Sequence, residues 1–395
     1  MIKILFVNHG LYYGGATASL FLLIKSLHEY SVEAHLRVTS CRSDEMKMDF
    51  LNYCESVEEV DPGQIYHSMA ASIGPVGIVK AILKSSDELI KDINELGIQI
   101  VHFNTTVFPH VLKRVRQETE AKIITHVREM FPEDRPILRQ YMINQIGRYS
   151  DCILAISDNE AKPFSNHSNV HVMPNPFDFA SLDNVGDTFR TERGISEEQV
   201  LVGMMGQCHK GKGQLEFLKA IKIVLAKRLP DLNVRFVLIG VNQPESWGLP
   251  LLDRLRRSYR YYNSLMRYMK EHNLDDDTIV LPYSYDVFPT LKAMDIMVRP
   301  AISGDPWGRD IIESMAFAKP IIATGESEFY VQNGENGYLV PPSDPQAMAE
   351  KIIELALDKD RRLSLGASGA QRIRQMCDLS NYGKNLNECY ESLVT

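Results

Sequence analysis

Paired cysteines are missing from this sequence. Its six cysteines are scattered, and none belongs to a Cys-x-x-Cys motif or stands at zinc-ligand spacing from histidines. They are Cys41, Cys54, Cys152, Cys208, Cys377 and Cys389. This pattern argues against a disulfide framework and a cysteine-based metal site, and it is typical of reduced thiols in a cytosolic protein. We expect no metal site.

Long apolar runs are also missing. No stretch approaches the ~18 apolar residues that a membrane-spanning helix needs. The apolar run within residues 1–10 is too short for a secretory signal peptide. We therefore expect a cytoplasmic protein.

An excess of positive charge is missing as well. The 43 Lys and Arg residues are outnumbered by 51 Asp and Glu residues, which gives a net charge of -8 at pH 7. A general nucleic-acid-binding protein needs a broadly basic surface, so we expect no nucleic-acid partner. The 395 residues, 44% of them hydrophobic, exceed what one ordinary core holds and predict a soluble protein of two domains.

The sequence does contain an alternation of short apolar runs with longer helical patterns, which predicts βα units and parallel sheets. In the first half we expect strands at 2–8, 34–39, 100–103, 123–126, 152–156 and 170–173. In the second half we expect them at 200–205, 235–239, 278–281, 296–298 and 320–323. Helices are expected, among others, at 16–30, 214–229, 311–317 and 380–393.

A turn-rich segment divides the two halves. Residues 174–178 read PNPFD, a rigid sequence suited to a domain boundary, and we place a hinge at 174–185. In open parallel sheets, ligands bind beyond the carboxyl ends of the strands. Two such sheets facing each other would place the active site in the cleft between them.

Residues 304–316 read GDPWGRDIIESMA and predict a strand end, a loop and a helix start. Asp305 suits the N-cap and Pro306 the first helical position, so the amides of the next residues would form an anion site. Glu313 would lie about 12 Å farther along the helix at ~1.5 Å per residue. Carboxylates that far apart cannot share a proton or a metal, but they could hold the two ends of a long ligand such as a sugar nucleotide.

Residues 304–324, which continue as FAKPIIAT, resemble the Glu-x7-Glu region of the retaining glycosyltransferases of family 4, which have the GT-B fold. The sequence NGENGYLVPP at 333–342 is similar to the family's Asp-Gly-x-x-Gly-x-Leu-Val-x-Pro segment. Residues 174–178 are similar to its Pro-Asn-Gly-Val-Asp interdomain segment. The resemblance covers essentially the whole chain and is strongest over 295–345.

Two residues depart from the family pattern. Asp305 replaces the first Glu of the motif and is one methylene shorter. Gln207, in the sequence GQCHKGKG at 206–213, stands where the family has a phosphate-binding Arg. A neutral Gln donates hydrogen bonds without neutralising a diphosphate. Lys212 matches the family's Lys, and Lys210 is a candidate for the missing charge.

The resemblance implies an α/β protein of the GT-B fold, with two Rossmann-like parallel-sheet domains facing across a deep cleft. Residues 1–178 would form the acceptor side, 179–379 the nucleotide-sugar donor side, and 380–395 a helix that packs back on the N-terminal domain. The implied activity is a retaining, metal-independent transfer of a sugar from a UDP- or GDP-linked donor to a hydroxyl acceptor. A saccharide or lipid-linked saccharide acceptor, used in cell-surface polysaccharide or glycoconjugate synthesis, is expected. The nucleotide sugar is a co-substrate, and no cofactor is expected.

The resemblance also assigns the donor side. Asp305 would contact sugar hydroxyls as a catalytic residue, with a simple helix cap as the alternative. Glu313 would bind the ribose, with a solvent-facing carboxylate as the alternative, and Lys212 would bind phosphate unless it is an ordinary loop lysine. The remaining donor-binding residues would be Gly15, Gln207, Trp307, Gly308 and Arg309.

On the acceptor side, His126 follows a buried strand and aligns with a strand-end His of the family, so it is the second catalytic candidate. The alternative for His126 is a structural histidine. Further acceptor-side candidates are Gly14, Asn104, Arg128 and Glu129. Gly14 and Gly15 would let a backbone approach the ligand closely, or they form a plain turn.

The segment from Leu252 to His272 carries six basic residues among tyrosines and methionines. Such a helix can lie on an anionic membrane surface and would then be a peripheral contact with its inner face. The alternative is a solvated helix face with snorkelling arginines. The nucleotide base is expected near Tyr283 and Tyr285.

Two other functions stay open at this point. One is a catalytically inactive homologue that binds sugar nucleotides, for which Gln207 and Asp305 are the arguments. The other is a sugar-nucleotide epimerase of the same fold, which would need acid/base carboxylates grouped at the sugar. The wide expected separation of Asp305 and Glu313 argues against the epimerase.

Overall fold

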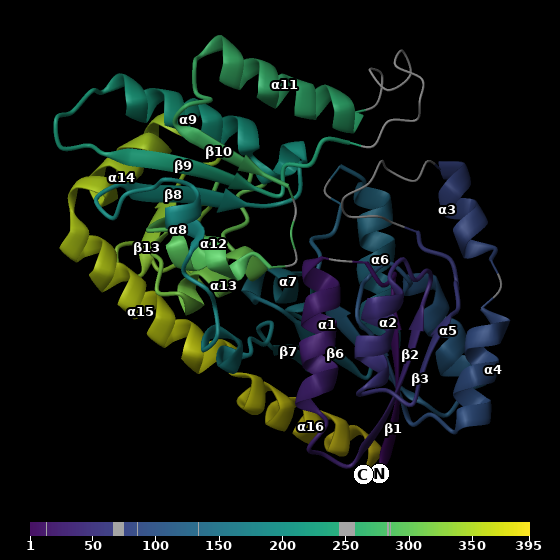
Figure 1. The fold of residues 1–395 in the computed structure, drawn as a ribbon. Helices are drawn as coiled ribbons and strands as arrows, with labels where there is room; N and C mark the ends of the chain where they lie inside the picture. Colours follow the sequence, from purple (N-terminus) through teal and green to yellow (C-terminus); the bar gives the residue numbers. More distant parts are fainter. Residues whose placement is uncertain are drawn as a thin grey trace. The chain divides into compact units, whose positions relative to one another are not determined.

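The computed structural model describes residues 1–12, 14–65, 75–84, 86–132, 134–244, 257–282, 284 and 286–395. The chain forms two compact units (Figure 1). Unit 1 comprises Met1–Phe177 and Cys377–Thr395, and unit 2 comprises Asp178–Met376. These borders lie close to the expected ones at 178 and 379, while the acceptor and donor roles of the two units stay predictions. Each unit is described by itself.

Unit 1 is built on a seven-stranded parallel sheet with the order β3-β2-β1-β4-β5-β6-β7. Its strands are β1 (Ile2–Asn8), β2 (Val32–Val38), β3 (Ser56–Glu59), β4 (Ile100–Phe103), β5 (Lys122–Val127), β6 (Cys152–Ala155) and β7 (Val170–Val172). Its helices are α1 (Gly15–Ser26), α2 (Asp44–Leu51), α3 (Pro75–Ile82), α4 (Asp87–Leu96), α5 (Pro109–Glu118), α6 (Pro136–Tyr149), α7 (Asp158–Ala161), η1 (Lys162–Phe164) and α16 (Leu379–Val394).

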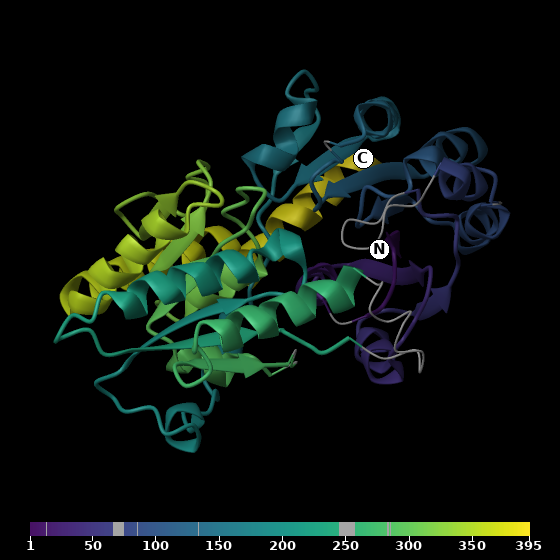
Figure 2. The same ribbon diagram turned by 90° about the horizontal axis from the view of Figure 1, so that it is seen from above.

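Alternate residues of β1 enter two different cores, because successive side chains of a strand point to opposite faces. Leu5 and Val7 belong to a cluster with residues of α4, α5 and α6, whereas Ile4 and Phe6 belong to one with residues of α1, α2 and α16. Helices therefore cover both faces of the sheet (Figures 1 and 2). Strands buried on both faces explain the continuous apolar runs of the sequence.

Unit 2 repeats this plan with a six-stranded parallel sheet of order β10-β9-β8-β11-β12-β13. Its strands are β8 (Val200–Met205), β9 (Val234–Ile239), β10 (Thr278–Leu281), β11 (Ile296–Arg299), β12 (Ile321–Thr324) and β13 (Gly337–Val340). Its helices are η2 (Phe179–Leu182), α8 (Phe189–Glu192), η3 (Lys210–Lys212), α9 (Gln214–Ala226), α11 (Arg257–Glu271), α12 (Phe288–Ala293), α13 (Arg309–Ala316), α14 (Pro345–Leu357) and α15 (Lys359–Cys377).

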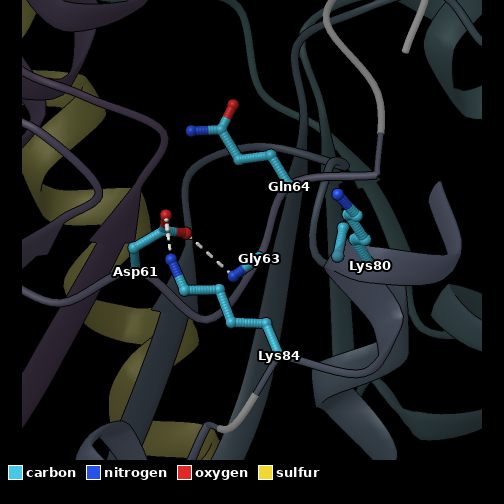
Figure 3. Close-up of a pocket in the computed structure, with 6 residues that line it drawn as sticks. Asp61, Gly63, Gln64, Lys80 and Lys84 are labelled. Atoms are coloured by element: carbon cyan, nitrogen blue, oxygen red, sulfur yellow. Dashed lines mark hydrogen bonds and ion pairs between the residues drawn. The ribbon is translucent and has the colours of Figure 1, made fainter. Parts of the chain in front are cut away.

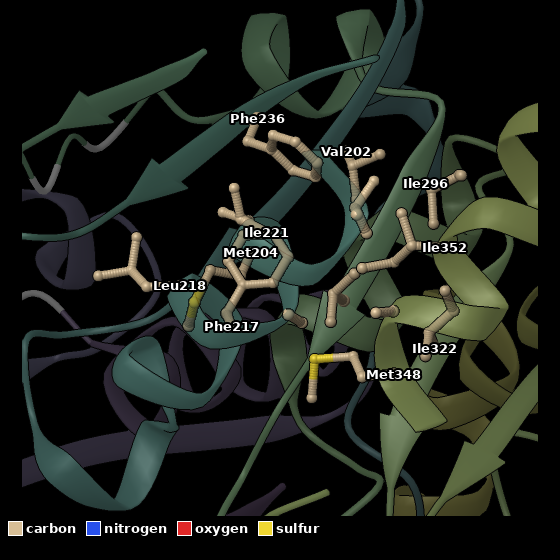
Figure 4. Close-up of a cluster of buried hydrophobic side chains, with 14 of the residues drawn as sticks. Val202, Met204, Phe217, Leu218, Ile221, Phe236, Ile296, Ile322, Met348 and Ile352 are labelled. Atoms are coloured by element: carbon tan, nitrogen blue, oxygen red, sulfur yellow. The ribbon is translucent and has the colours of Figure 1, made fainter. Parts of the chain in front are cut away.

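The main core of unit 2 lies between the sheet and the helices α9 and α14 (Figure 4). Phe217 and Ile221 of α9 and Ile352 of α14 are fully buried against Phe236 of β9 and Ile322 of β12. Each such side chain contributes about 1.5–3 kcal/mol through removal of apolar surface from water. The α/β fold with two parallel sheets is confirmed.

The final helix, α16, returns to unit 1 and packs on α1. A Cβ at Gly383 would lie 2.3 Å from the carbonyl oxygen of Ser26, so only glycine allows the two helices this approach. Leu386 and Tyr390 on the same helix are fully buried in the core of unit 1. The predicted packing of the final helix on the N-terminal half is thus present within unit 1.

All strands predicted from the sequence are present, and their observed borders differ from the predicted ones by no more than two residues. Two strands were not predicted: β3, with the sequence SVEE, and β13, with the sequence GYLV. Both lie at the edge of their sheet, where one side of a strand is not paired and a continuous apolar run is not required.

Part of the basic segment from Leu252 to His272 lies outside the described residues, namely 252–256. The described helix α11 packs its apolar side on unit 2, where Leu265 and Met269 are buried and Tyr261 contacts the core. Arg267 is exposed on the other side. This arrangement favours the solvated helix face over a membrane contact. None of the helices within the described ranges is long and apolar enough to cross a membrane.

Candidate functional site

Two loops of unit 2 meet where β8 and β11 end. The loop 206–213 follows β8, and the loop 300–308 follows β11. The amide of Ile302 donates to the carbonyl of Gly211 at 3.0 Å. Gly213 has φ +79°, and a Cβ there would lie 1.8 Å from the carbonyl oxygen of Pro300. The glycine is required both by its backbone conformation and by this contact.

Lys212 lies among charged residues of the second loop. Burial and the neighbouring Arg299 lower the pKa of the Lys212 ammonium, while Asp310 and Asp305 oppose this shift. The aliphatic part of Lys212 lies over Gly206, where a Cβ would come within 3.5 Å. The side chain also stands directly before α9, whose N-terminus favours anions. A lysine that is partly desolvated and close to a helix N-terminus is suited to bind a phosphate.

Arg299 at the end of β11 holds the second loop in place. Its Nε donates to the carbonyl of Asp305 at 2.6 Å, and its Nη1 donates to Oδ1 of Asp310 at 2.5 Å. Both residues of the Arg299–Asp310 ion pair have side chains only 10% exposed. Sequence reasoning missed this pair, although a charged residue at the end of a buried strand was a signal for it.

The predicted start of the helix at Asp305 and Pro306 was wrong. Helix α13 begins at Arg309, and its N-cap is Gly308 with φ 151°. The reason is the bond from Arg299 to the Asp305 carbonyl, which holds that peptide outside the helix. A Cβ at Gly308 would lie 2.5 Å from Oδ1 of Asp310, so this cap must be glycine.

The later start of helix α13 moves the expected anion site and changes the expected distance between Asp305 and Glu313. The first helical bond runs from Ile312 to the Gly308 carbonyl at 3.2 Å. The amides without an acceptor inside the helix are therefore those of residues 309–311 rather than 307–309. The 12 Å separation of Asp305 and Glu313, which assumed a continuous helix, does not apply. The Asp305 carboxylate instead accepts a hydrogen bond from the Ser303 hydroxyl.

Glu313 is buried, which rules out the solvent-facing alternative. Its Oε1 accepts from Nε of Arg309 at 2.9 Å, and Nη2 of Arg309 lies at the same distance. Burial raises the pKa of the Glu313 carboxyl, and Arg309 opposes this shift. Arg309 thus orients Glu313 and opposes the effect of burial on its charge. Trp307, in the loop before it, is also buried.

Gln207 lies in the loop after β8 and is half-buried. The carbonyls of Gly206 and Gln207 accept from Nε2 of Gln214 at 3.2 and 2.8 Å. This fixes the backbone of the loop beside Lys212. Lys210 is exposed on the same turn. Tyr283 and Tyr285, expected near the base, lie outside the described residues.

In unit 1, a polar network lies at the carboxyl ends of β1, β4 and β5. Asn104 donates to Oδ1 of Asn8 at 3.0 Å and accepts from Nε of Arg128 at 2.7 Å. Arg128 also donates to Asn175 and, at 3.2 Å, to Nδ1 of His126. The structure therefore brings Asn104, Arg128 and His126 together. Sequence reasoning missed Asn8 and Asn175, which complete the network.

His126 is fully buried and part of a longer chain of rings. Its Nδ1 lies 3.3 Å from Nε2 of His102, whose Nδ1 lies 2.7 Å from the hydroxyl of Tyr390. Burial, and then the charge of Arg128, lowers the pKa of His102 to about 3 and that of His126 well below its usual range. Both imidazoles are therefore neutral at physiological pH.

Glu129 lies beside this network and accepts three hydrogen bonds. The Thr105 hydroxyl donates to its Oε1 at 2.9 Å, and the amide and hydroxyl of Thr106 donate to its Oε2 at 3.3 Å. Burial raises the pKa of the Glu129 carboxyl, while these bonds oppose the shift. Glu129 also raises the pKa of the Tyr12 hydroxyl, after burial, so the two side chains are neighbours.

Gly14 of the first loop has no steric requirement among the described residues. Gly14 is the N-cap of α1 with an extended φ of 178°, and a Cβ there would only touch the Tyr12 ring at 4.0 Å. Gly15 is an exposed first residue of the helix. A Cβ at Gly10 would lie 2.9 Å from that ring. The close approach in this loop is therefore at Gly10.

A separate surface hollow of about 270 Å³ lies in unit 1, lined by residues of 61–64 and 80–84 (Figure 3). The Asp61 carboxylate in it is bound to the Lys84 ammonium at 2.5 Å and accepts from the Gly63 amide at 2.8 Å. None of the predicted site residues lines it. The charges of Asp61 and Lys84 are satisfied by each other, so we assign the hollow no ligand.

Comparisons with known proteins find similarity to glycosyltransferases. Residues 186–372 match the family described as "Glycosyl transferases group 1". D-inositol 3-phosphate glycosyltransferase of Corynebacterium urealyticum is 24% identical over 278 residues, which are 67% of this chain and 61% of the relative. The capsular polysaccharide biosynthesis glycosyltransferase CapM of Staphylococcus aureus is 25% identical over 202 residues, 51% of this chain and 48% of the relative. The chain thus spans about half to three fifths of the length of these relatives.

Solved structures show the same architecture. Anabaena Alr3699/HepE in complex with UDP has a TM-score of 0.78 at 19% identity, with 99% of this chain and 100% of that chain covered. Sucrose-phosphate synthase from Thermosynechococcus elongatus has a TM-score of 0.77 at 15% identity, with 100% and 99% covered. The two parallel-sheet units therefore have the architecture of the GT-B fold.

Proposed function

We propose that this protein is a glycosyltransferase that moves a sugar from a nucleotide-diphosphate donor to a hydroxyl acceptor. The observation that carries the proposal is the cluster at the carboxyl edge of the unit 2 sheet. There the charges of the Arg299–Asp310 ion pair act on Lys212, and helix α13, on which Asp310 lies, carries the amides at its start and the Arg309–Glu313 pair. Unit 2 would bind the donor, and unit 1 the acceptor.

The roles follow from the charges. A departing nucleoside diphosphate develops negative charge, which Lys212 and the amides of residues 309–311 are suited to stabilise. Glu313, oriented by Arg309, would accept hydrogen bonds from the ribose hydroxyls. Asp305 would contact hydroxyls of the donor sugar. Gln207 and the Trp307–Gly308 segment would line the same donor site without adding charge.

The proposed nucleotide and acceptor are argued from the relatives. HepE was solved with UDP and with UDP-glucose, which favours a UDP-linked donor over a GDP-linked one. Names of relatives such as CapM and the lipopolysaccharide core biosynthesis glycosyltransferase LpsE of Rhizobium meliloti favour a saccharide or lipid-linked acceptor in cell-surface glycan synthesis. A retaining and metal-independent reaction belongs to this proposal through the family resemblance. No residue of the cluster is assigned as a covalent nucleophile.

Release of nucleotide from a panel of UDP- and GDP-sugars, with and without saccharide acceptors, tests the proposal. We expect acceptor-dependent release of one nucleotide, and a loss of about 10²- to 10³-fold in Lys212→Met, because one preorganised charge contact is worth about 2.7–4 kcal/mol. Lys222→Met, at an exposed position on α9 of the same unit, is the matched control and should retain activity. Tight nucleotide binding without release by any donor would instead show the inactive homologue. Conversion of the donor to its epimer without release would show the epimerase.

A further inference from the structure

Three fully buried rings form a row in unit 1 that starts on the C-terminal helix. Tyr390 of α16 lies 2.7 Å from Nδ1 of His102 on β4, and Nε2 of His102 lies 3.3 Å from Nδ1 of His126 on β5. Nη2 of Arg128 approaches the same Nδ1 of His126 at 3.2 Å. All three rings have 0% exposure. The row joins two elements that are 264 residues apart in sequence, from 126 to 390.

The direction of every proton in this row follows from Arg128. A guanidinium can only donate, so Nδ1 of His126 must carry a lone pair. A neutral imidazole then has its proton on Nε2. Nε2 of His102 faces the same lone pair and is therefore the donor, which leaves Nδ1 of His102 as an acceptor for the Tyr390 hydroxyl. One tautomer of each histidine satisfies all these contacts.

The Nε2–H of His126 is the end of the row. This atom is buried and has no hydrogen-bond partner among the described residues. A buried donor without an acceptor costs about as much as the desolvation of the group, so such a group in a native structure calls for an explanation. A ligand oxygen at this position would supply the acceptor.

We propose that Tyr390 and His102 are positioning residues that, with Arg128, hold His126 as the Nε2–H tautomer. His126 is thereby a hydrogen-bond donor to an oxygen of a bound saccharide, and it cannot act as a general base through Nε2. The identity of the ligand rests on the proposed function, whereas the tautomer does not. The C-terminal helix, in addition to covering the sheet, sets the chemistry of a strand-end residue in the same unit.

The tautomer is tested on the full-length, ligand-free protein labelled with 15N-histidine. Long-range 1H–15N spectra distinguish a protonated ring nitrogen from an unprotonated one, and the His126 signals are identified by their loss in His126→Gln. We expect a protonated Nε2 and an unprotonated Nδ1 for both His126 and His102. A His126 protonated at Nδ1 would overturn the proposal, whatever the protein catalyses.

The role of the helix is tested in Tyr390→Phe, which removes only the hydroxyl. We expect His102 to populate both tautomers and the His126 Nδ1 signal to shift. Leu386→Val, at a fully buried position of the same helix, perturbs packing without removing a hydrogen-bonding atom and should leave the tautomers of both histidines unchanged. Histidine signals in Tyr390→Phe identical to those of the wild type would contradict a positioning role.

Kinetics with the active sugar donor and acceptor show whether His126 acts as a hydrogen-bond donor or as a general base. Gln places an N–H close to the position of the histidine Nε2, so His126→Gln should retain more activity than His126→Ala. Tyr390→Phe should lower kcat/KM by about five- to tenfold, the factor for one ordinary hydrogen bond, without moving the acid limb of the pH profile. Equal losses in the two His126 variants, or a shifted acid limb, would refute the donor role. If no donor is turned over, the spectra still decide the tautomer.

Discussion

Removal of the Asp310 carboxylate is the change with the largest expected effect on unit 2. In Asp310→Ala, the Arg299 guanidinium, in a side chain only 10% exposed, keeps its bond to the Asp305 carbonyl but loses its counter-charge. Breaking a buried ion pair from one side costs about 3–5 kcal/mol, because the remaining charge stays desolvated. For a unit of this size, 1 kcal/mol corresponds to roughly 2–4 °C. We therefore expect the unfolding temperature of unit 2 to fall by about 6–20 °C.

Tryptophan fluorescence reports this transition selectively. The chain has two tryptophans, Trp247 and Trp307, and the described one, Trp307, is buried in unit 2. Thermal and urea unfolding of the full chain, followed by this signal, therefore measures the unit that carries the pair. Glu271→Ala is the matched control, since it breaks the exposed Arg267–Glu271 pair of the same unit. That loss should stay below about 0.5 kcal/mol.

A second variant separates the effect of the buried charge on stability from the effect of the loop conformation on nucleotide binding. Replacement of both partners by apolar residues, as Arg299→Met with Asp310→Leu, should recover most of the stability, because such replacements are often neutral or stabilising. Nucleotide binding should not recover, since the loop at 305 has lost its contact with Arg299. The reasoning is refuted if Asp310→Ala unfolds within about 1 kcal/mol of the wild type, or if the double variant is no more stable than the single one.

Three further predictions concern backbone, ligand binding and pH. Gly213→Ala should destabilise unit 2 by clearly more than Gly194→Ala, because both glycines have positive φ but only Gly213 would clash with a neighbouring carbonyl; similar urea midpoints would contradict this. UDP binding at alkaline pH should take up a proton on Lys212, whose pKa is lowered in the free protein, and affinity should fall as pH rises; calorimetry in buffers of different ionisation enthalpy measures the proton uptake, and Lys212→Met should abolish it. Because burial lowers the pKa of His102 to about 3 and that of His126 well below 6.5, the unfolded state binds more protons. Stability should therefore fall as pH drops from about 6.5 toward 3, by up to about 1.4 kcal/mol per pH unit for each histidine; a flat stability profile over this range would be the opposite result.

The strands of both sheets were predictable because parallel strands buried on both faces leave continuous apolar runs. β1, β4, β8 and β10 have the predicted borders. The edge strands β3 and β13 were missed because a short edge strand does not need such a run. The helices were found less accurately, as the borders of α1 and α9 show.

The start of α13 shows why the site could be predicted only in part. Asp305 and Pro306 form a good local helix start, and no local signal opposes it. The tertiary contact of Arg299 with the Asp305 carbonyl decides the conformation instead. Lys212 and Glu313 were singled out because their motifs are local, and their roles in binding stay predictions. Asp310, His102 and Tyr390 were missed because their roles depend on contacts between distant parts of the chain.

The position of UDP in a crystal of the complex tests the central claim most directly. We predict the diphosphate within hydrogen-bond distance of Lys212 Nζ and of the amides at 309–311, with the ribose hydroxyls at the Glu313 carboxylate. UDP bound elsewhere on unit 2, or bound here with its ribose away from Glu313, would contradict the proposed donor site.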